Sequence, residues 1–173
     1  MTFRKATEQD LQAIAEIYAD VHTEEELGHT STGWMREIYP TPRTAALALA
    51  RDDLFVQEED GQIVGTAIIN QQQVDVYAGA PWEFAAADSE VMVLHTLVIS
   101  PKAAGKGCGK AFVRFYEEYA LAHNCHFLRI DTNARNARAR AMYHKLGFKE
   151  IDIVPCEFNG IAGVQLVLLE KAL

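Results

Sequence analysis

A glycine-rich turn between a strand and a helix limits the folds open to this chain more than any other feature. An apolar run reaches Pro101, and beyond the turn aromatic and aliphatic residues recur at helical spacing as far as Tyr116. The turn itself consists of Gly105, Lys106, Gly107, Cys108, Gly109 and Lys110. Glycines at such a junction let the backbone approach an anion closely, and the first helical N–H groups have no partner within the helix. The sequence therefore predicts a phosphate-binding turn at the start of a helix.

Two nucleotide motifs do not fit this turn. A P-loop needs four residues between its glycines and a Ser or Thr after the lysine, whereas three residues separate Gly105 from Gly109 and Ala111 follows Lys110. A dinucleotide-binding fingerprint needs a third glycine where Phe112 stands. A plain flexible turn also remains open at this point, so the rest of the chain must decide.

Length and composition predict one soluble domain that spans residues 1–173. The chain is 49% hydrophobic and 23% charged, as expected of a globular protein. No apolar run approaches the roughly 18 residues of a membrane span, and the N-terminus lacks the apolar segment of a signal peptide. We therefore expect a cytoplasmic protein with no membrane partner.

Charge and cysteine content narrow the partners. The net charge of −8 argues against a nucleic-acid partner, because phosphate contacts need a basic face. Three cysteines, at positions 108, 125 and 156, are odd in number and lack the paired spacing of a zinc site or a disulfide framework. We expect reduced thiols and no metal.

Hydrophobic periodicity and turn residues predict an α/β chain (α+β in some schemes) without an internal repeat. We expect strands at residues 2–6, 54–56, 63–70, 90–100, 127–131, 148–158 and 163–170. Helices are expected from Thr7 onward, at 34–38, at 44–51, after the glycine turn and at 136–145. Asp60-Gly61 and Asn159-Gly160 predict hairpin turns, and residues 71–89 an irregular loop over the sheet.

A second motif makes the glycine turn specific. Asn136, Ala139, Tyr143 and Gly147-Phe148 follow it in an order and spacing that resemble the GNAT superfamily of acetyl-CoA-dependent N-acetyltransferases. The resemblance covers nearly the whole chain. It implies a mixed, mostly antiparallel sheet of six to seven strands, with a central splayed parallel pair and helices on both faces.

The resemblance also implies acetyl-CoA as co-substrate, without a metal. Backbone groups of Leu97, Val98 and Ile99 would bind the pantetheine arm, and residues 104–110 would bind the pyrophosphate. The family carries Gln or Arg where this chain has Ala104, so Lys106 or Lys110 would supply the charge. On the helix expected at 136–145, the cofactor-binding residues would be Asn136, Ala139 and Tyr143.

Tyr143 is the candidate catalytic acid, because the family uses a tyrosine there to protonate the coenzyme A thiolate. Without the motif, a half-buried core tyrosine whose hydroxyl finds a partner would be the better interpretation of Tyr143; with the motif, the catalytic role is favoured. For the general base, Asp131 and His95 rank level and Glu90 behind them. Each has a structural alternative, namely a turn-capping carboxylate, a core histidine and a solvated strand end. A chain of waters is the further alternative.

The implied function is acetyl transfer to a primary amine of a small molecule or peptide, by direct attack in a ternary complex. A non-catalytic acetyl-CoA-binding sensor is the alternative. The acceptor would bind against residues 28–42 and 71–89, whose aromatic residues either form its wall or pack the loops onto the sheet. These aromatic residues are Trp34, Tyr39, Tyr77, Trp82 and Phe84. The last strands could shape the pocket or pair two subunits, which leaves a homodimer open.

Overall fold

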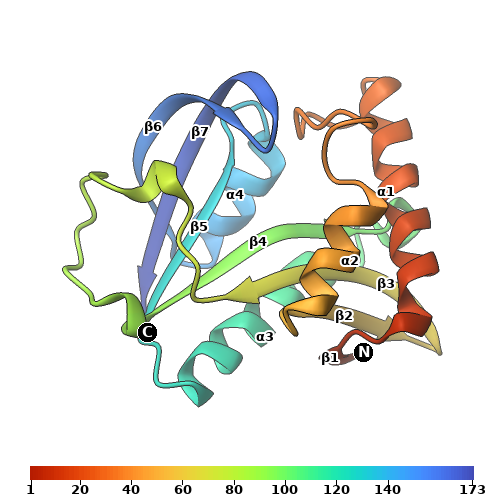
Figure 1. The fold of residues 1–173 in the computed structure, drawn as a ribbon, viewed down its shortest axis with the longest axis horizontal. Helices are drawn as coiled ribbons and strands as arrows, with labels where there is room; N and C mark the ends of the chain where they lie inside the picture. The colour runs from red at the N-terminus through yellow and green to blue at the C-terminus, as the bar shows by residue number, and fades with distance from the viewer.

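The computed structural model describes all 173 residues, which are built around one seven-stranded sheet in the order β1-β2-β3-β4-β5-β7-β6 (Figure 1). The strands are β1 (Thr2–Lys5), β2 (Leu54–Glu59), β3 (Gln62–Asn70), β4 (Val91–Ile99), β5 (Phe127–Asn133), β6 (Lys149–Phe158) and β7 (Ile161–Ala172). All neighbouring strands are antiparallel except β4 and β5, which are parallel. The mixed, mostly antiparallel sheet expected from the sequence is confirmed.

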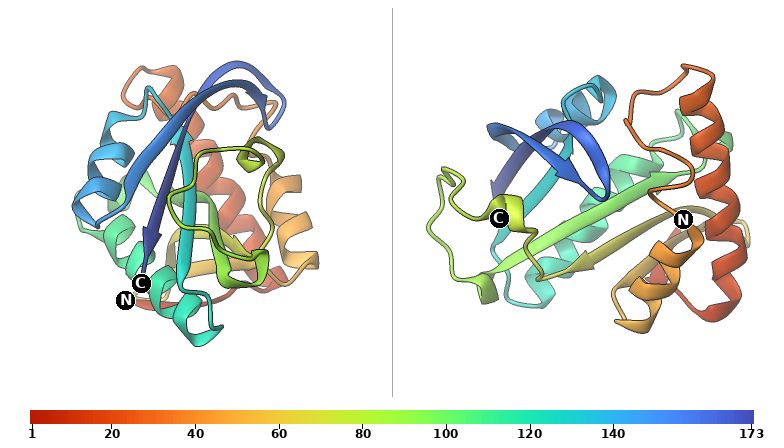
Figure 2. Two further views of the ribbon diagram at one scale, coloured as in Figure 1. Left: turned by 90° about the vertical axis from the view of Figure 1, so that its left-hand side faces the viewer. Right: turned by 45° about the horizontal axis from the view of Figure 1, so that its top comes forward.

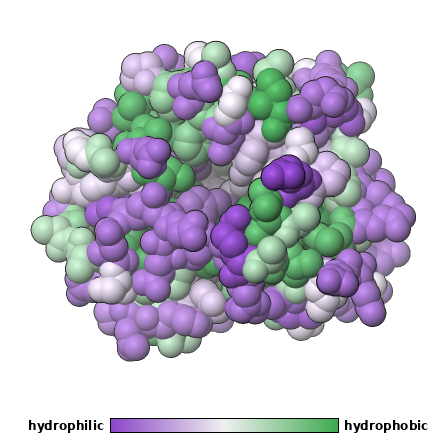
Figure 3. All heavy atoms as spheres, viewed as in Figure 1, coloured by the Kyte–Doolittle hydropathy of each residue, from purple (hydrophilic) through white to green (hydrophobic).

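Helices cover both faces of the sheet (Figures 1 and 2). The helices are α1 (Leu11–Glu26), α2 (Pro42–Ala50), α3 (Cys108–Ala122) and α4 (Ala137–Lys145), with short 3₁₀ helices at Glu8–Asp10, Asp75–Tyr77, Asp88–Glu90 and Pro101–Ala103. Strand alternation separates two cores: Leu54 and Val56 pack with α1 and α2, whereas Phe55 packs with α3 and α4. The outer face of α2 is partly apolar, because Leu47 is exposed and Figure 3 shows hydrophobic spheres gathered over this helix. None of the helices combines the length and apolar character needed to cross a membrane.

The parallel pair β4–β5 opens into a fork. Pairing joins Val91–Leu94 to Phe127–Ile130 and then stops. Beyond that point β4 pairs only with β3, and β5 only with β7 (Figure 1). The register of β3 against β4 shifts by one residue at this level, and Thr96 has a φ of +50°. This β-bulge bends β4 and increases its twist as the two strands diverge.

The segment between α1 and α2 crosses the mouth of the fork (Figure 2). The short helix predicted at residues 34–38 is wrong: Met35 and Tyr39 instead form an isolated bridge around a turn. A helix of so few residues has the nucleation cost without enough later hydrogen bonds to offset it. The helix predicted at 44–51 begins earlier, at Pro42, because proline suits a first helical position and the Thr44 hydroxyl accepts a hydrogen bond from the Thr41 N–H at 3.0 Å.

Candidate active site

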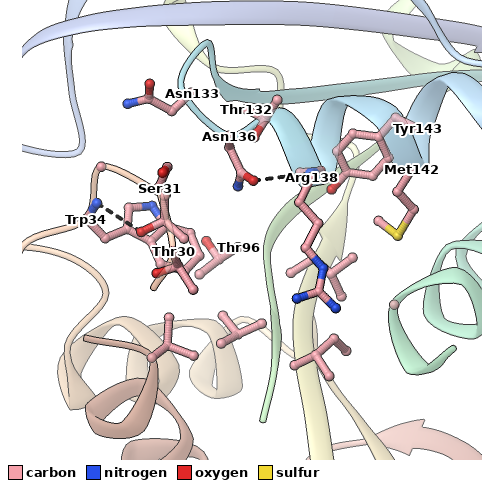
Figure 4. Close-up of a pocket in the computed structure, with 18 of the residues that line it drawn as sticks. Thr30, Ser31, Trp34, Thr96, Thr132, Asn133, Asn136, Arg138, Met142 and Tyr143 are labelled. Carbon is pink, nitrogen blue, oxygen red and sulfur yellow. Dashed lines mark hydrogen bonds between the residues drawn. The ribbon is translucent and has the colours of Figure 1, made fainter. Parts of the chain in front are cut away.

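A cleft of about 840 Å³ occupies the fork between β4 and β5. It extends from the glycine turn, past the end of β5 and α4, to the segment that precedes α2. Figure 4 shows α4 side chains on one side of the cleft and Trp34 with its neighbours on the other. The resemblance implies a splayed parallel pair, and the cleft lies where these two strands separate.

The glycine turn closes one end of the cleft with backbone rather than side chains. Gly105 and Gly107 have φ values of +80° and +81°, a conformation that glycine adopts without strain. Gly107 is the residue that caps α3, so the unpartnered N–H groups of the first helical turn begin directly after it. A Cβ at Gly109 would lie 3.2 Å from Met142 Sδ, so this glycine lets α3 and α4 approach closely. Every residue of the turn from 104 to 110 lines the cleft except Lys106.

The open edge of β4 forms the floor. Leu97, Val98 and Ile99 all line the cleft, beyond the last residue that pairs with β5. Their edge toward β5 is therefore free to hydrogen-bond an extended ligand that carries amide groups, as an added strand would. Thr96, which precedes them, is a β-branched residue at positive φ and thus a strained position. Its hydroxyl shares a hydrogen bond with the Tyr39 hydroxyl, which links the bulge to the segment before α2.

Helix α4 and its capping residue contribute Asn136, Ala139 and Tyr143, all of which line the cleft. Asn136 Oδ1 accepts a hydrogen bond from the Ala139 N–H at 3.1 Å and so caps α4, which leaves its NH₂ group for a ligand. Tyr143 is 5% exposed and packs edge to face on Phe148. Burial raises the pKa of Tyr143 above its usual range, with a smaller contribution from the charge of Asp131, so the hydroxyl stays protonated.

The three base candidates lie in different surroundings. Asp131 Oδ2 accepts a hydrogen bond from the Tyr77 hydroxyl at 2.7 Å, and burial raises the pKa of Asp131 to about 6. His95 Nε2 lies 2.9 Å from Asn70 Oδ1, and burial lowers the pKa of His95 to about 4. Glu90 is exposed at the far end of β4, where it accepts the Ala87 N–H. The structure thus brings Asp131 and His95 to the cleft with Tyr143 and leaves Glu90 outside it.

Some aromatic residues of the two loops line the cleft, and the others pack the loops onto the sheet. Trp34 and Tyr39 line the cleft. Tyr77 is buried beneath it against Asp131, and Trp82 donates its indole N–H to the Tyr77 carbonyl at 3.0 Å. Phe84 packs on Phe127, with ring centroids 5.6 Å apart.

Arg138 is a site residue that the sequence reasoning missed. It points from α4 into the cleft in Figure 4 and forms no ion pair, whereas its neighbour Arg140 pairs with Glu150 at 2.7 Å. The sequence signal that could have revealed it is the group of three arginines at 135, 138 and 140. In the structure only Arg140 of these three has an acidic partner. Arg135 and Lys145 also line the cleft, and neither forms an ion pair. Arg135 precedes α4 and lines a second hollow with Gly33, Ile161 and Val164, so the unpaired positive charges are spread along the cleft.

Comparison with known proteins gives consistent matches over this whole arrangement. The model of the acetyltransferase (GNAT) family matches residues 11–148. An uncharacterized N-acetyltransferase of Methanocaldococcus jannaschii is 22% identical over 177 positions, which cover 99% of this chain and 92% of the relative. An acetyltransferase of the GNAT family from Streptococcus agalactiae superposes with a TM-score of 0.83 at 19% identity, over 99% of this chain and 95% of that one. YncA of Salmonella typhimurium, determined with its cofactor acetyl-CoA, superposes with a TM-score of 0.68 at 21% identity, over 99% and 93%.

Proposed function

Because the chain belongs to the GNAT family of acetyltransferases, we propose that it transfers the acetyl group of acetyl-CoA to a primary amine of a small molecule or peptide by direct attack in a ternary complex. The observation that carries this proposal is the fork itself. Its free strand edge lies between the start of α3, whose N–H groups would bind an anion, and the side chains of Tyr143 and Asp131, which would act as acid and base. A thioester held along β4 would then face both groups.

The cleft suits the chemical parts of acetyl-CoA. The first turn of α3 offers unpartnered N–H groups to a pyrophosphate, and the edge of β4 offers amide partners to the pantetheine arm. Lys110 and Arg138 supply the positive charge that Ala104 does not. Acetyl-CoA is also the cofactor named for YncA, which shares this fold. Bound there, acetyl-CoA supplies an activated acyl group.

Side chains of the cleft then accept and donate the protons of the reaction. Asp131 takes a proton from the incoming ammonium, because its raised pKa of about 6 suits a base that works near neutral pH. His95 is a weaker candidate, because its pKa of about 4 leaves the ring a poor base and its Nε2 contacts Asn70. Tyr143 keeps its proton at neutral pH and can donate it to the departing thiolate. The strained Thr96 holds the bulge against Tyr39 and so fixes the distance between β4 and the acceptor side.

Calorimetry with acetyl-CoA, coenzyme A and ATP, together with a thiol-release assay over a panel of amines, tests this proposal. Arg138→Ala should weaken acetyl-CoA binding by about 10- to 100-fold, the value of one charge-assisted hydrogen bond. Arg114→Ala is the matched control, since Arg114 is exposed on α3, forms no ion pair and does not line the cleft. Binding of ATP without acetyl-CoA would refute the cofactor assignment. Binding of acetyl-CoA without acetylation of any amine would favour the sensor alternative.

A further inference from the structure

The side of the cleft that faces α4 is an irregular segment without backbone hydrogen bonds of its own. It consists of residues 30–34, all of which line the cleft, and Figure 4 shows Trp34 across the cleft from Tyr143. No backbone N–H of these five residues donates to a backbone carbonyl. Such a segment needs hydrogen bonds from another source to keep one conformation. We call residues 30–34 the acceptor wall.

One carboxylate supplies most of those hydrogen bonds. Glu25, in the last turn of α1, accepts the Thr32 N–H at 2.8 Å and the Gly33 N–H at 3.0 Å. It also accepts the hydroxyls of Thr30 and Thr32, at 2.9 and 3.0 Å. Burial alone would raise the pKa of Glu25, but these hydrogen bonds together lower it below its ordinary value. Four donors of the acceptor wall therefore converge on one ionised group, and hydrogen bonds to an ionised group are the stronger kind.

The contacts of Glu25 extend to the side chain of Trp34 and to the end of β5. The Thr32 hydroxyl that donates to Glu25 accepts the Trp34 N–H at 3.2 Å (Figure 4). Gly33 lies against the last residue of β5, because a Cβ on Gly33 would be only 2.4 Å from Asn133 Nδ2. Glu25 thus fixes the acceptor wall between α1 and β5, although Glu25 itself does not line the cleft.

The next acidic residue provides a natural comparison. Glu26 also connects α1 to the segment before α2, because it pairs with Arg36 at 2.9 Å. This ion pair joins exposed side chains, and such pairs contribute little to stability. Neither Glu26 nor Arg36 lines the cleft. The two glutamates therefore contact the same segment, but only Glu25 holds the part that lines the cleft.

We propose that Glu25 is a positioning residue for the acceptor amine, whose carboxylate holds the acceptor wall in the conformation that binds the amine. This inference rests on the proposed acetyl transfer and concerns only the acceptor side of the cleft. Without the carboxylate, the wall adopts the binding conformation for part of the time, and the apparent KM for the amine rises by the inverse of that fraction. Binding of acetyl-CoA at the glycine turn and β4 does not depend on this wall.

Kinetics of Glu25→Gln test the proposal. The glutamine keeps the shape but replaces one acceptor oxygen by an NH₂ group, which would face N–H or O–H donors. Thiol release is measured with phenethylamine, spermidine and tetraalanine, and the amine that the wild type acetylates fastest is used. We expect its KM to rise at least about tenfold, while the Kd of acetyl-CoA in calorimetry changes by less than about twofold. Glu26→Gln, the matched control, should change neither quantity by more than about twofold.

Fluorescence of Trp34 provides a measurement that does not depend on acetyl transfer. Trp82→Phe leaves Trp34 as the only tryptophan, so quenching by acrylamide reports the accessibility of the acceptor wall. In this background Glu25→Gln should raise the quenching constant at least about twofold, because the wall opens more often. Glu26→Gln should leave the quenching constant unchanged.

The outcomes separate this inference from the proposed function. If the wild type acetylates no amine, the proposed function fails, and the quenching of Trp34 alone decides whether Glu25 holds the wall. An unchanged KM or unchanged quenching in Glu25→Gln overturns the inference and leaves acetyl transfer standing. A parallel loss of kcat and of acetyl-CoA-binding sites at constant KM also overturns it, because that result would show a general loss of folded protein.

Discussion

Asp131 should couple activity and stability to pH in opposite directions. Burial raises the pKa of Asp131 from 3.8 to about 6, and the hydrogen bond from Tyr77 partly opposes this rise. At that pKa the carboxylate is roughly 90% ionised at pH 7 and roughly 10% at pH 5, so its contribution to kcat/KM should fall roughly tenfold between them. A carboxyl with an ordinary pKa would stay ionised across this range.

The same rise in pKa means that ionisation of Asp131 lowers the stability of the folded protein. The pKa of Asp131 is higher in the folded protein than in the unfolded chain, so proton binding to Asp131 stabilises the fold. This contribution is fully present below pH 3.8 and is lost as the pH rises through about 6. The difference corresponds to at most about 3 kcal/mol at pH 8. Asp131→Asn keeps the shape and still offers an oxygen to Tyr77, but it cannot ionise. The variant should be more stable than the wild type at pH 8, by up to that amount, and should lose most activity.

Two measurements check this reasoning. The ratio of wild-type to Asp131→Asn kcat/KM at pH 5 to 8 cancels the ionisation of the amine itself, which is common to both proteins. Urea unfolding over the same range gives the difference in the free energy of unfolding. Asp152→Asn, at an exposed position of β6 outside the cleft, should change neither quantity. An activity ratio that stays flat from pH 5 to 8, or no gain in stability at pH 8, would refute the role and the surroundings given to Asp131.

Three further changes probe the rest of the site. Tyr143→Phe should lower kcat by roughly 100-fold with little change in stability, because it removes only a hydroxyl from a ring that stays packed on Phe148 beside the cleft; unchanged turnover would remove it from the mechanism. Ala104→Gln should tighten acetyl-CoA binding in calorimetry by about 3- to 10-fold, since it adds one polar contact beside the turn; weaker binding would mean that the turn has no room for it. Gly33→Ala should lower both thermal stability and activity more than Gly28→Ala does. Both glycines have a φ of +77°, but only at Gly33 would a Cβ meet Asn133 Nδ2, at 2.4 Å; equal effects would show that this contact is unimportant.

Local patterns were enough to predict most of the fold. The strand and helix positions agree because apolar periodicity and turn chemistry act over a few residues, as in the Asp60-Gly61 and Asn159-Gly160 hairpins. The helix predicted at residues 34–38 was wrong because the conformation of this segment depends on contacts across the fork, such as that of Tyr39 with Thr96. Membership of the GNAT family and the acetyltransferase activity predicted from the two motifs are likewise confirmed.

The surroundings of the site residues were beyond the reach of sequence patterns. The partner of Asp131 is Tyr77, 54 residues earlier in the chain and in an irregular loop, so no spacing rule could pair them. That loop is held in turn by Arg129, which lies over the Trp82 ring at 4.0 Å and bonds to Gln73. The direction of Arg138 depends on how α4 sits beside β5, which is a tertiary property. Glu90 is a candidate base because the sequence predicts it on the central strand, yet β4 begins only at Val91 and Glu90 lies at the end of that strand opposite the cleft.

The point at which the parallel pairing of β4 and β5 ends explains why polar side chains gather in the cleft. The parallel pairing of β4 and β5 ends at Leu94 and Ile130, and both strands continue beyond it with their carboxyl ends toward the same side. Every backbone group on the facing edges past that point needs a hydrogen-bond partner that the sheet cannot supply. His95 and Thr96 on one strand and Asp131 on the other are the first cleft-lining polar residues after the split, so the position that lacks strand pairing is also the position of the candidate acid–base residues. A ligand that replaces the missing strand is therefore brought directly between them.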